Sequence, residues 1–312
     1  MRTTNGSRLG PGRARSLAVA VVAALLVTAC GASAPSGGPS SSTSGALRVV
    51  ATTTVFADIV RNVGGDRVTV SSIIPAGAGP EDYEPKPDDA RKLAGADLIV
   101  SGGLGLDDFL ERIVVAAGEG SAPRLVLGDG VPTISEAGTA NPHVWLDPSL
   151  VVDHYLPAIT AKLSAIDPAG ATTYGANRDA YAAKIAAMDA VNKTKIASIP
   201  AAHRKLVTFH DAFPYFAAHY GFELVGVIAA NVGQEPTAAD LAKLVETVKT
   251  AGVPAVFSEA QFSPGLARTL ADEAGISRVV STLYNDTVGP PPTDTYLTMM
   301  AWNVDQIVTA LG

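Results

Sequence analysis

Acidic and histidine side chains stand at four places in the chain where they could bind a metal ion. In chain order the candidates are Glu81, His143, His210 and Asp286. Two come from each half of the chain, and in open parallel sheets ligands bind beyond the carboxyl ends of the strands. Imidazole and carboxylate groups suit first-row divalent metals. The four side chains therefore predict a four-ligand metal site lined from both halves.

Each candidate is weak evidence when taken alone. Glu81 follows a glycine-rich loop, His143 lies in the segment NPHVWLDP, and His210 and Asp286 each follow a predicted strand. A single histidine after a strand is more often structural than a ligand. The other histidines, His154, His203 and His219, lie in helical or surface-like stretches without a companion residue. We interpret those three as structural.

The elements that must position the candidates alternate between strand and helix. Predicted strands cover Leu47–Thr53, Val68–Ile74, Asp97–Ser101, Arg124–Leu127, Lys205–Phe209, Glu223–Ile228, Ala255–Ser258 and Arg278–Thr282. Predicted helices include Val55–Val63, Asp107–Ala117, Ala238–Ala251 and Pro264–Ala274. Such alternation indicates an α/β fold with mainly parallel, helix-covered sheets.

A long helix is predicted between the two halves. Ala169–Ile199 is rich in alanine, contains no proline, and repeats apolar residues at helical spacing between Pro168 and Pro200. The alternative is two shorter helices with a break near Gly175.

The first 29 residues have the pattern of an export signal. Residues 1–29 carry four arginines and no acidic residue, then an apolar run that ends shortly before Cys30. The stretch Val27–Cys30 resembles a bacterial lipobox, in which the cysteine is acylated and becomes the first mature residue. Residues 30–46 hold no charge and no large apolar side chain, which predicts a flexible tether. The alternative is an ordinary secreted protein with a stray cysteine.

Charge and length narrow the class of protein. The formal charge is −7, and removal of the four arginines in residues 1–29 makes it −11. An acidic chain argues against nucleic acid and anionic lipid as partners. The body from about residue 47 to residue 312 is long enough for two domains.

Several blocks of the body together resemble the metal-binding substrate receptors of bacterial zinc and manganese ABC importers, the cluster A-I or ZnuA/TroA-like family. The blocks are ATTTVFADIVRNVGGDRVTV, DYEPKPDDARKLAGADLIVSGGLGLDDFL, NPHVWLDP, TFHDAFPYFAAHYGFELVGV, FSEAQFSPGLARTLADEAGI and YNDTVGPPPTDTYLTMMAWNVDQI. The resemblance covers nearly the whole body.

The resemblance implies two α/β lobes joined by one rigid helix, with the metal held between them by one ligand from each of four loops. The expected division is a lobe of residues 47–167, a connecting helix of residues 168–200 and a lobe of residues 201–312. His143, His210 and Asp286 match the second, third and fourth ligands. The first is normally the histidine of a G-x-D-P-H stretch, where this chain has Glu81. We expect Glu81 to replace it, with Asp82 and Glu84 as alternatives.

The function that follows is capture of one divalent transition-metal ion, zinc or manganese, and its delivery to an ABC importer permease and its ATPase. We expect a monomer on the extracytoplasmic face of the bacterial cell membrane, held there only by its lipid anchor, and no enzymatic activity. Zinc should bind more tightly than manganese in vitro. The alternatives are a receptor for a haem or siderophore chelate and a secreted metallohydrolase, and the sequence leaves an adhesin role open.

Overall fold

The first half of the chain forms a parallel sheet with strand order β2-β1-β3-β4. The computed structural model describes residues 45–312 apart from residues 82, 118–121, 137, 231 and 233. The strands span Leu47–Ala51 (β1), Val68–Ser72 (β2), Leu98–Ser101 (β3) and Arg124–Val126 (β4). Central strands β1 and β3 are largely buried, as is typical of parallel sheets covered on both faces.

The second half of the chain contains two separate pairs of parallel strands. Lys205–Thr208 (β7) pairs with Glu223–Val227 (β8), and Val256–Glu259 (β9) pairs with Val279–Leu283 (β10). β7 also contacts β9, so the two pairs lie beside each other, and they are together called the second sheet below. A short antiparallel hairpin, Ser135–Glu136 (β5) and Thr139–Ala140 (β6), lies between the halves in sequence.

Helices cover these sheets in separate layers. Around the first sheet they span Thr54–Gly64 (α1), Pro87–Ala94 (α2), Asp108–Ala117 (α3), Pro148–Leu150 (α4) and Leu156–Ile166 (α5). The later ones span Pro214–Tyr220 (α7), Ala238–Ala251 (α8), Gly265–Ala274 (α9) and Tyr296–Leu311 (α10). One apolar cluster packs α2 and α3 on the first sheet, and another packs α8 and α9 on the second. The predicted α/β class with mainly parallel sheets is confirmed.

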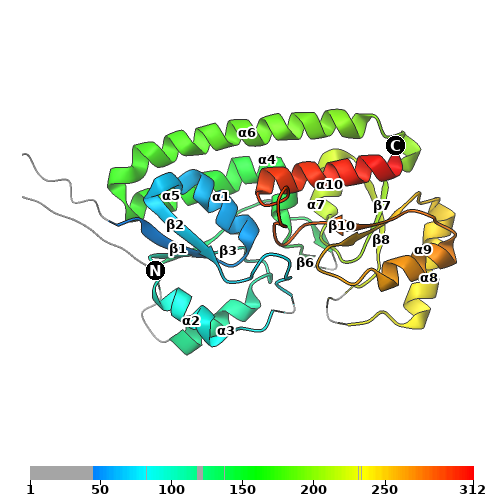
Figure 1. Cartoon of the computed structure of the whole chain (residues 1–312), viewed down its shortest axis with the longest axis horizontal. Coiled ribbons are helices and arrows are strands. Elements are labelled where there is room, and N and C mark those ends of the chain that lie inside the picture. The colour runs from blue at the N-terminus through cyan, green and yellow to red at the C-terminus, as the bar shows by residue number, and fades with distance from the viewer. Residues whose placement is uncertain (1–44, 82, 118–121, 137, 231, 233) are drawn as a thin grey trace, which may run out of the picture. The chain divides into compact units, whose positions relative to one another are not determined.

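The connecting helix α6 runs from Ala171 to Ala197 without a break at Gly175, so the two-helix alternative is wrong. At 1.5 Å per residue it is about 40 Å long. It contacts α1 and α5 beside the first sheet and α10 beside the second (Figure 1). On the inner face of α6, the side chains of Tyr174, Tyr181 and Ile185 are buried.

The largest apolar cluster extends over both sheets. It joins Phe56 of α1, Trp145, Ile185 of α6, Phe216 of α7 and Met299 of α10. Gly45–Gly312 accordingly forms one compact unit, and the division into lobes 47–167 and 201–312 stays a prediction.

The predicted strand and helix ends were within one or two residues of the observed ones. No described helix is long and apolar enough to cross a membrane. The predicted signal peptide of residues 1–29 and Cys30 lie outside the described residues, as do most residues of the predicted linker.

Candidate metal centre

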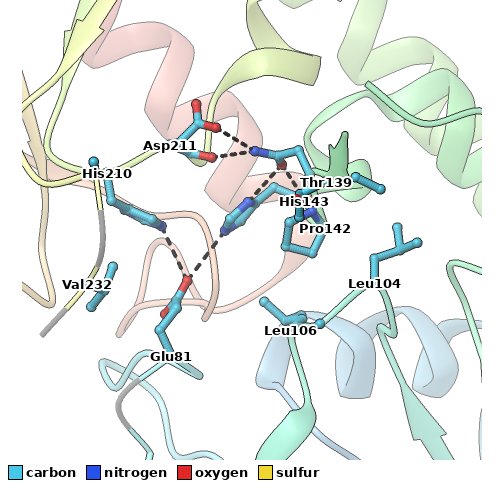
Figure 2. Close-up of a pocket in the computed structure, with 13 residues that line it drawn as sticks. Glu81, Leu104, Leu106, Thr139, Pro142, His143, His210, Asp211 and Val232 are labelled. Atoms are coloured by element: carbon cyan, nitrogen blue, oxygen red, sulfur yellow. Dashed lines mark hydrogen bonds and ion pairs between the residues drawn. The ribbon is translucent and has the colours of Figure 1, made fainter. Parts of the chain in front are cut away.

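The four sequence-predicted ligands lie together. One oxygen or nitrogen atom from each of Glu81, His143, His210 and Asp286 can be chosen so that all lie within 4.8 Å of one another. The two histidines and Asp286 are buried, whereas 23% of the Glu81 side chain is exposed. Figure 2 shows Glu81 rising from its loop between the two imidazole rings.

Glu81 reaches the cluster from the loop that follows β2. Its Oε1 lies 3.6 Å from Nε2 of His143 and 3.5 Å from Nε2 of His210. The same loop is tied to the other side of the site, because the Gly77 backbone N–H donates to Thr287 Oγ1 at 3.0 Å. Of the alternatives, Glu84 is exposed and outside the cluster, and Asp82 lies outside the described residues.

His143 is oriented by Asn141, which follows the β5–β6 hairpin. The Asn141 Oδ1 atom accepts from the His143 backbone N–H and lies 3.0 Å from its Nδ1. The amide nitrogen of Asn141 donates to the Asp211 carbonyl at 2.7 Å, which fixes the amide's direction. Nε2 of His143 is therefore left to face the cluster, 3.2 Å from Asp286 Oδ1.

His210 follows β7 and also turns its two nitrogens in different directions. Nε2 faces Glu81 and lies 3.7 Å from Asp286 Oδ2. Nδ1 faces away from the cluster, 3.2 Å from Oε1 of Glu259. The ring of Phe262 lies edge-on at 5.3 Å and forms an apolar wall.

Asp286 follows β10 on a segment held from both halves of the chain. Gln261 donates to Asp286 Oδ2 at 2.8 Å. The Trp145 indole donates to the Asn285 carbonyl, and the Val288 N–H donates to Thr54 Oγ1 of α1. These contacts fix the direction of the Asp286 carboxylate.

The donor atoms fit a divalent cation. Among the described residues, the buried Nε2 of His143 and Oδ1 of Asp286 have no hydrogen-bond partner in normal geometry. Buried polar atoms are costly when unpaired. A cation between them would satisfy both, and imidazole and carboxylate are suitable ligands for it.

The acids and imidazoles shift each other's proton affinity. Although burial opposes the change, close contacts with His143 and His210 lower the pKa of Glu81 below its usual range. Burial also opposes the rise in the pKa of His143, but contacts with Asp286 and Glu81 raise it. The pKa of His210 is raised well above its usual value against burial, chiefly by Glu259. A cation must therefore compete with protons for these imidazoles.

The cluster opens to a cavity of about 670 Å³. Its lining includes Leu104 and Leu106 from the first half and Asp211 and Val232 from the second (Figure 2). Asp286 does not line this cavity and is fully buried. An ion entering from the cavity would meet Glu81 and the histidines before Asp286.

Sequence reasoning missed the residues that hold the ligands. Asn141, Gln261 and Glu259 had no assigned role, although Glu259 directly follows the strand that was predicted to end at Ser258. The structural interpretation of His203 agrees with its contact at 3.0 Å with the Leu311 carbonyl. The expectation that His219 has no companion was wrong, because its two nitrogens lie 2.9 Å from Asp147 and 2.8 Å from Asp189.

Comparison with known proteins points to metal transport. The family model for zinc-uptake complex component A, periplasmic, matches residues 49–310. The manganese-binding lipoprotein MntA of Halalkalibacterium halodurans is 31% identical over 94% of this chain and 97% of that protein. The iron-binding protein YfeA of Yersinia pestis is 34% identical over 87% of this chain and 88% of that protein. The solved structure of the periplasmic zinc-binding protein TroA of Treponema pallidum has a TM-score of 0.80 and 29% identity, covering 86% of this chain and all of that one.

Proposed function

The chain belongs to the family of zinc-uptake complex component A, the metal-binding receptors of ABC importers, and we propose that Glu81, His143, His210 and Asp286 together capture one divalent transition-metal ion. The ion is the transported substrate. A permease and its ATPase receive it, and the receptor acts as a monomer.

One observation carries the proposal. Four donor side chains, one from each of four separate segments, converge within 4.8 Å, and three of the four are buried. A purely structural cluster would give each buried polar atom a hydrogen-bond partner. Here the described donors instead leave Nε2 of His143 and Oδ1 of Asp286 facing each other without hydrogen bonds.

Four side-chain ligands also argue against a hydrolytic enzyme. A catalytic zinc usually keeps one coordination position for water beside three protein ligands. A four-ligand site is closed in that sense, so the arrangement supports binding and release rather than turnover.

Zinc is the ion that we propose binds most tightly in vitro, with manganese weaker. Zinc exceeds manganese in intrinsic affinity at nearly any nitrogen and oxygen site. The two carboxylates nevertheless make the donor set harder than three imidazoles would be. The relatives named above are described as manganese-, iron- and zinc-binding, which is consistent with a site that accepts several of these ions.

We place the protein on the extracytoplasmic face of the cell membrane, anchored through acylated Cys30. The stretch Val27–Cys30 and the description of the relative MntA as a lipoprotein support this placement. Replacement of Cys30 by Ala should leave unprocessed precursor or release protein into the medium. Acylated, membrane-bound protein after that change would contradict the anchor.

The test of the metal site is a titration. Protein stripped with chelator should bind one zinc ion per chain and melt at a higher temperature with it, because a ligand specific to the native state adds stability. His143→Ala and His210→Ala should lose most of that rise, while His154→Ala serves as a matched control outside the cluster. Unchanged zinc affinity in both cluster variants would refute the assignment.

A further inference from the structure

Glu259 is buried directly behind one proposed ligand. It is the last residue of β9, its accessible surface is 0%, and its Oε1 lies 3.2 Å from Nδ1 of His210. That nitrogen is the one turned away from the cluster. Glu259 is therefore not one of the four converging donors, but it touches one of them from the far side.

The carboxylate of Glu259 has no other support among the described residues. Neither of its oxygens has a hydrogen-bond partner in normal geometry, and no described lysine or arginine pairs with it. Nearby, Phe262 presents an apolar ring to His210 rather than a donor. Burying an unpaired carboxylate is strongly unfavourable. Packing alone therefore does not explain why a glutamate occupies position 259.

The two imidazoles differ in what lies behind them. The Nδ1 of His143 faces the neutral amide oxygen of Asn141 at 3.0 Å, whereas that of His210 faces a carboxylate. A carboxylate behind an imidazole fixes the ring's orientation and increases the basicity of the nitrogen that binds the metal. The chain thus supplies one ordinary and one strengthened imidazole donor.

We propose that Glu259 is a positioning residue for metal capture, which directs Nε2 of His210 at the ion and strengthens that bond. The inference rests on the proposed function of the cluster. It also adds a third carboxylate, beside Glu81 and Asp286, to a site whose ion carries two positive charges. When His210 is neutral, Glu259 consequently destabilises the empty protein, and it stabilises the loaded one.

These opposite effects separate positioning from simple packing. Glu259→Gln keeps the size of the side chain and an oxygen that can accept from Nδ1, but it removes the charge. We expect zinc affinity to fall about 10- to 100-fold, while the melting temperature of the chelator-stripped protein, measured in alkali where His210 is neutral, stays equal or rises. A packing role predicts the reverse, namely a less stable stripped protein with little change in affinity. Glu223→Gln, an exposed acid on β8, is the matched control and should change neither quantity.

A second measurement does not depend on a variant. In the zinc-loaded wild-type protein, purified as the cell produces it, nitrogen NMR of the His210 imidazole should show a protonated Nδ1 and a metal-bound Nε2.

Zinc bound through Nδ1 would overturn the inference. So would a Glu259→Gln protein that binds zinc as tightly as wild type while the His210→Ala protein does not. If His210→Ala also binds zinc normally, the proposed metal site itself fails.

Discussion

The indole nitrogen of Trp145 donates a 2.8 Å hydrogen bond to the backbone carbonyl of Asn285. This bond ties the segment that carries His143 to the segment that carries Asp286, which lies far away in sequence. The hydroxyl of Tyr296 in turn donates to the Trp145 carbonyl at 2.8 Å. The fold therefore sets the spacing of two proposed ligands, independently of their own side-chain contacts.

Trp145→Phe should weaken both the fold and the site. The change removes the donor and leaves the buried carbonyl of Asn285 unpaired. The free energy of unfolding should fall by about 1–3 kcal/mol as a result. The Asp286 segment would also lose one of its anchors, and zinc affinity should fall by roughly tenfold or more. Urea denaturation measures the first effect, and calorimetric zinc titration measures the second.

Trp302→Phe is the matched control for that change. Its indole also donates to a carbonyl, that of Thr282 at 2.8 Å, but the bond is exposed to solvent and neither residue belongs to the cluster. Its effect on stability should stay below about 1 kcal/mol, since water can replace the lost donor. If both tryptophan variants bind zinc like wild type, other contacts hold Asp286 in place.

Zinc affinity should fall as the pH falls. Without an ion, the pKa values of His143 and His210 are raised against the effect of burial by their acidic neighbours, so both imidazoles hold protons more strongly than free histidine. Below the raised pKa values, an entering ion must displace those protons, and above them it need not. Binding enthalpies measured near pH 7 in buffers of different ionisation enthalpy should reveal proton release. Enthalpies that do not depend on the buffer would contradict the raised values.

His219 should stabilise the fold at mildly acidic pH and lose that effect in alkali. Burial opposes the change, but contacts with Asp147 and Asp189 raise the pKa of His219. Its contribution is therefore complete below about pH 6.5, the usual value for histidine, and disappears as the pH rises through the raised value. His219→Gln should lower the free energy of unfolding by about 1.5–3 kcal/mol at about pH 6, and by less at about pH 9.

Urea denaturation at both pH values checks this expectation, with His154→Gln as the control because no described contact joins His154 to those aspartates. Equal losses at the two pH values would mean that His219 stabilises through packing alone. In stronger acid the contribution should shrink again, because contacts with His219 lower the pKa values of Asp147 and Asp189 and these acids must then be protonated.

The local pattern of the sequence predicted the fold well because strand and helix signals are short-range. The run Val68–Ile74 was predicted as one strand, and β2 ends at Ser72. The Ile73 and Ile74 N–H groups nevertheless continue to donate to Ala51 and Thr52 at 2.9 Å, so the difference lies in where the regular ladder ends. The continuous core across both sheets could not be predicted, since it depends on how α6 and α10 pack.

The convergence of the four candidate ligands could be predicted, but the residues that contact them from behind could not. Each candidate carries a local signal: His210 and Asp286 follow predicted strands, Glu81 follows a glycine-rich loop, and His143 lies in NPHVWLDP. The roles of Asn141, Gln261 and Glu259 come from contacts with residues on other elements, which no single-sequence pattern encodes. The two aspartates that contact His219 were missed for the same reason, because they lie on other segments that pack beside α7.

Glu81 is the residue whose replacement tests the choice of metal most directly. It stands where the resemblance predicts a histidine, and it contacts both imidazoles of the cluster. Glu81→His would convert two imidazoles and two carboxylates into three imidazoles and one carboxylate, a softer set that favours zinc. Competitive titration should therefore show the preference for zinc over manganese widening by roughly tenfold. Glu84→His is the matched control, because Glu84 is exposed and outside the cluster, and its preference should equal that of wild type. An unchanged preference in Glu81→His, together with a Glu81→Ala variant that binds zinc as tightly as wild type, would place Glu81 outside the metal's coordination and leave three side chains to hold the ion.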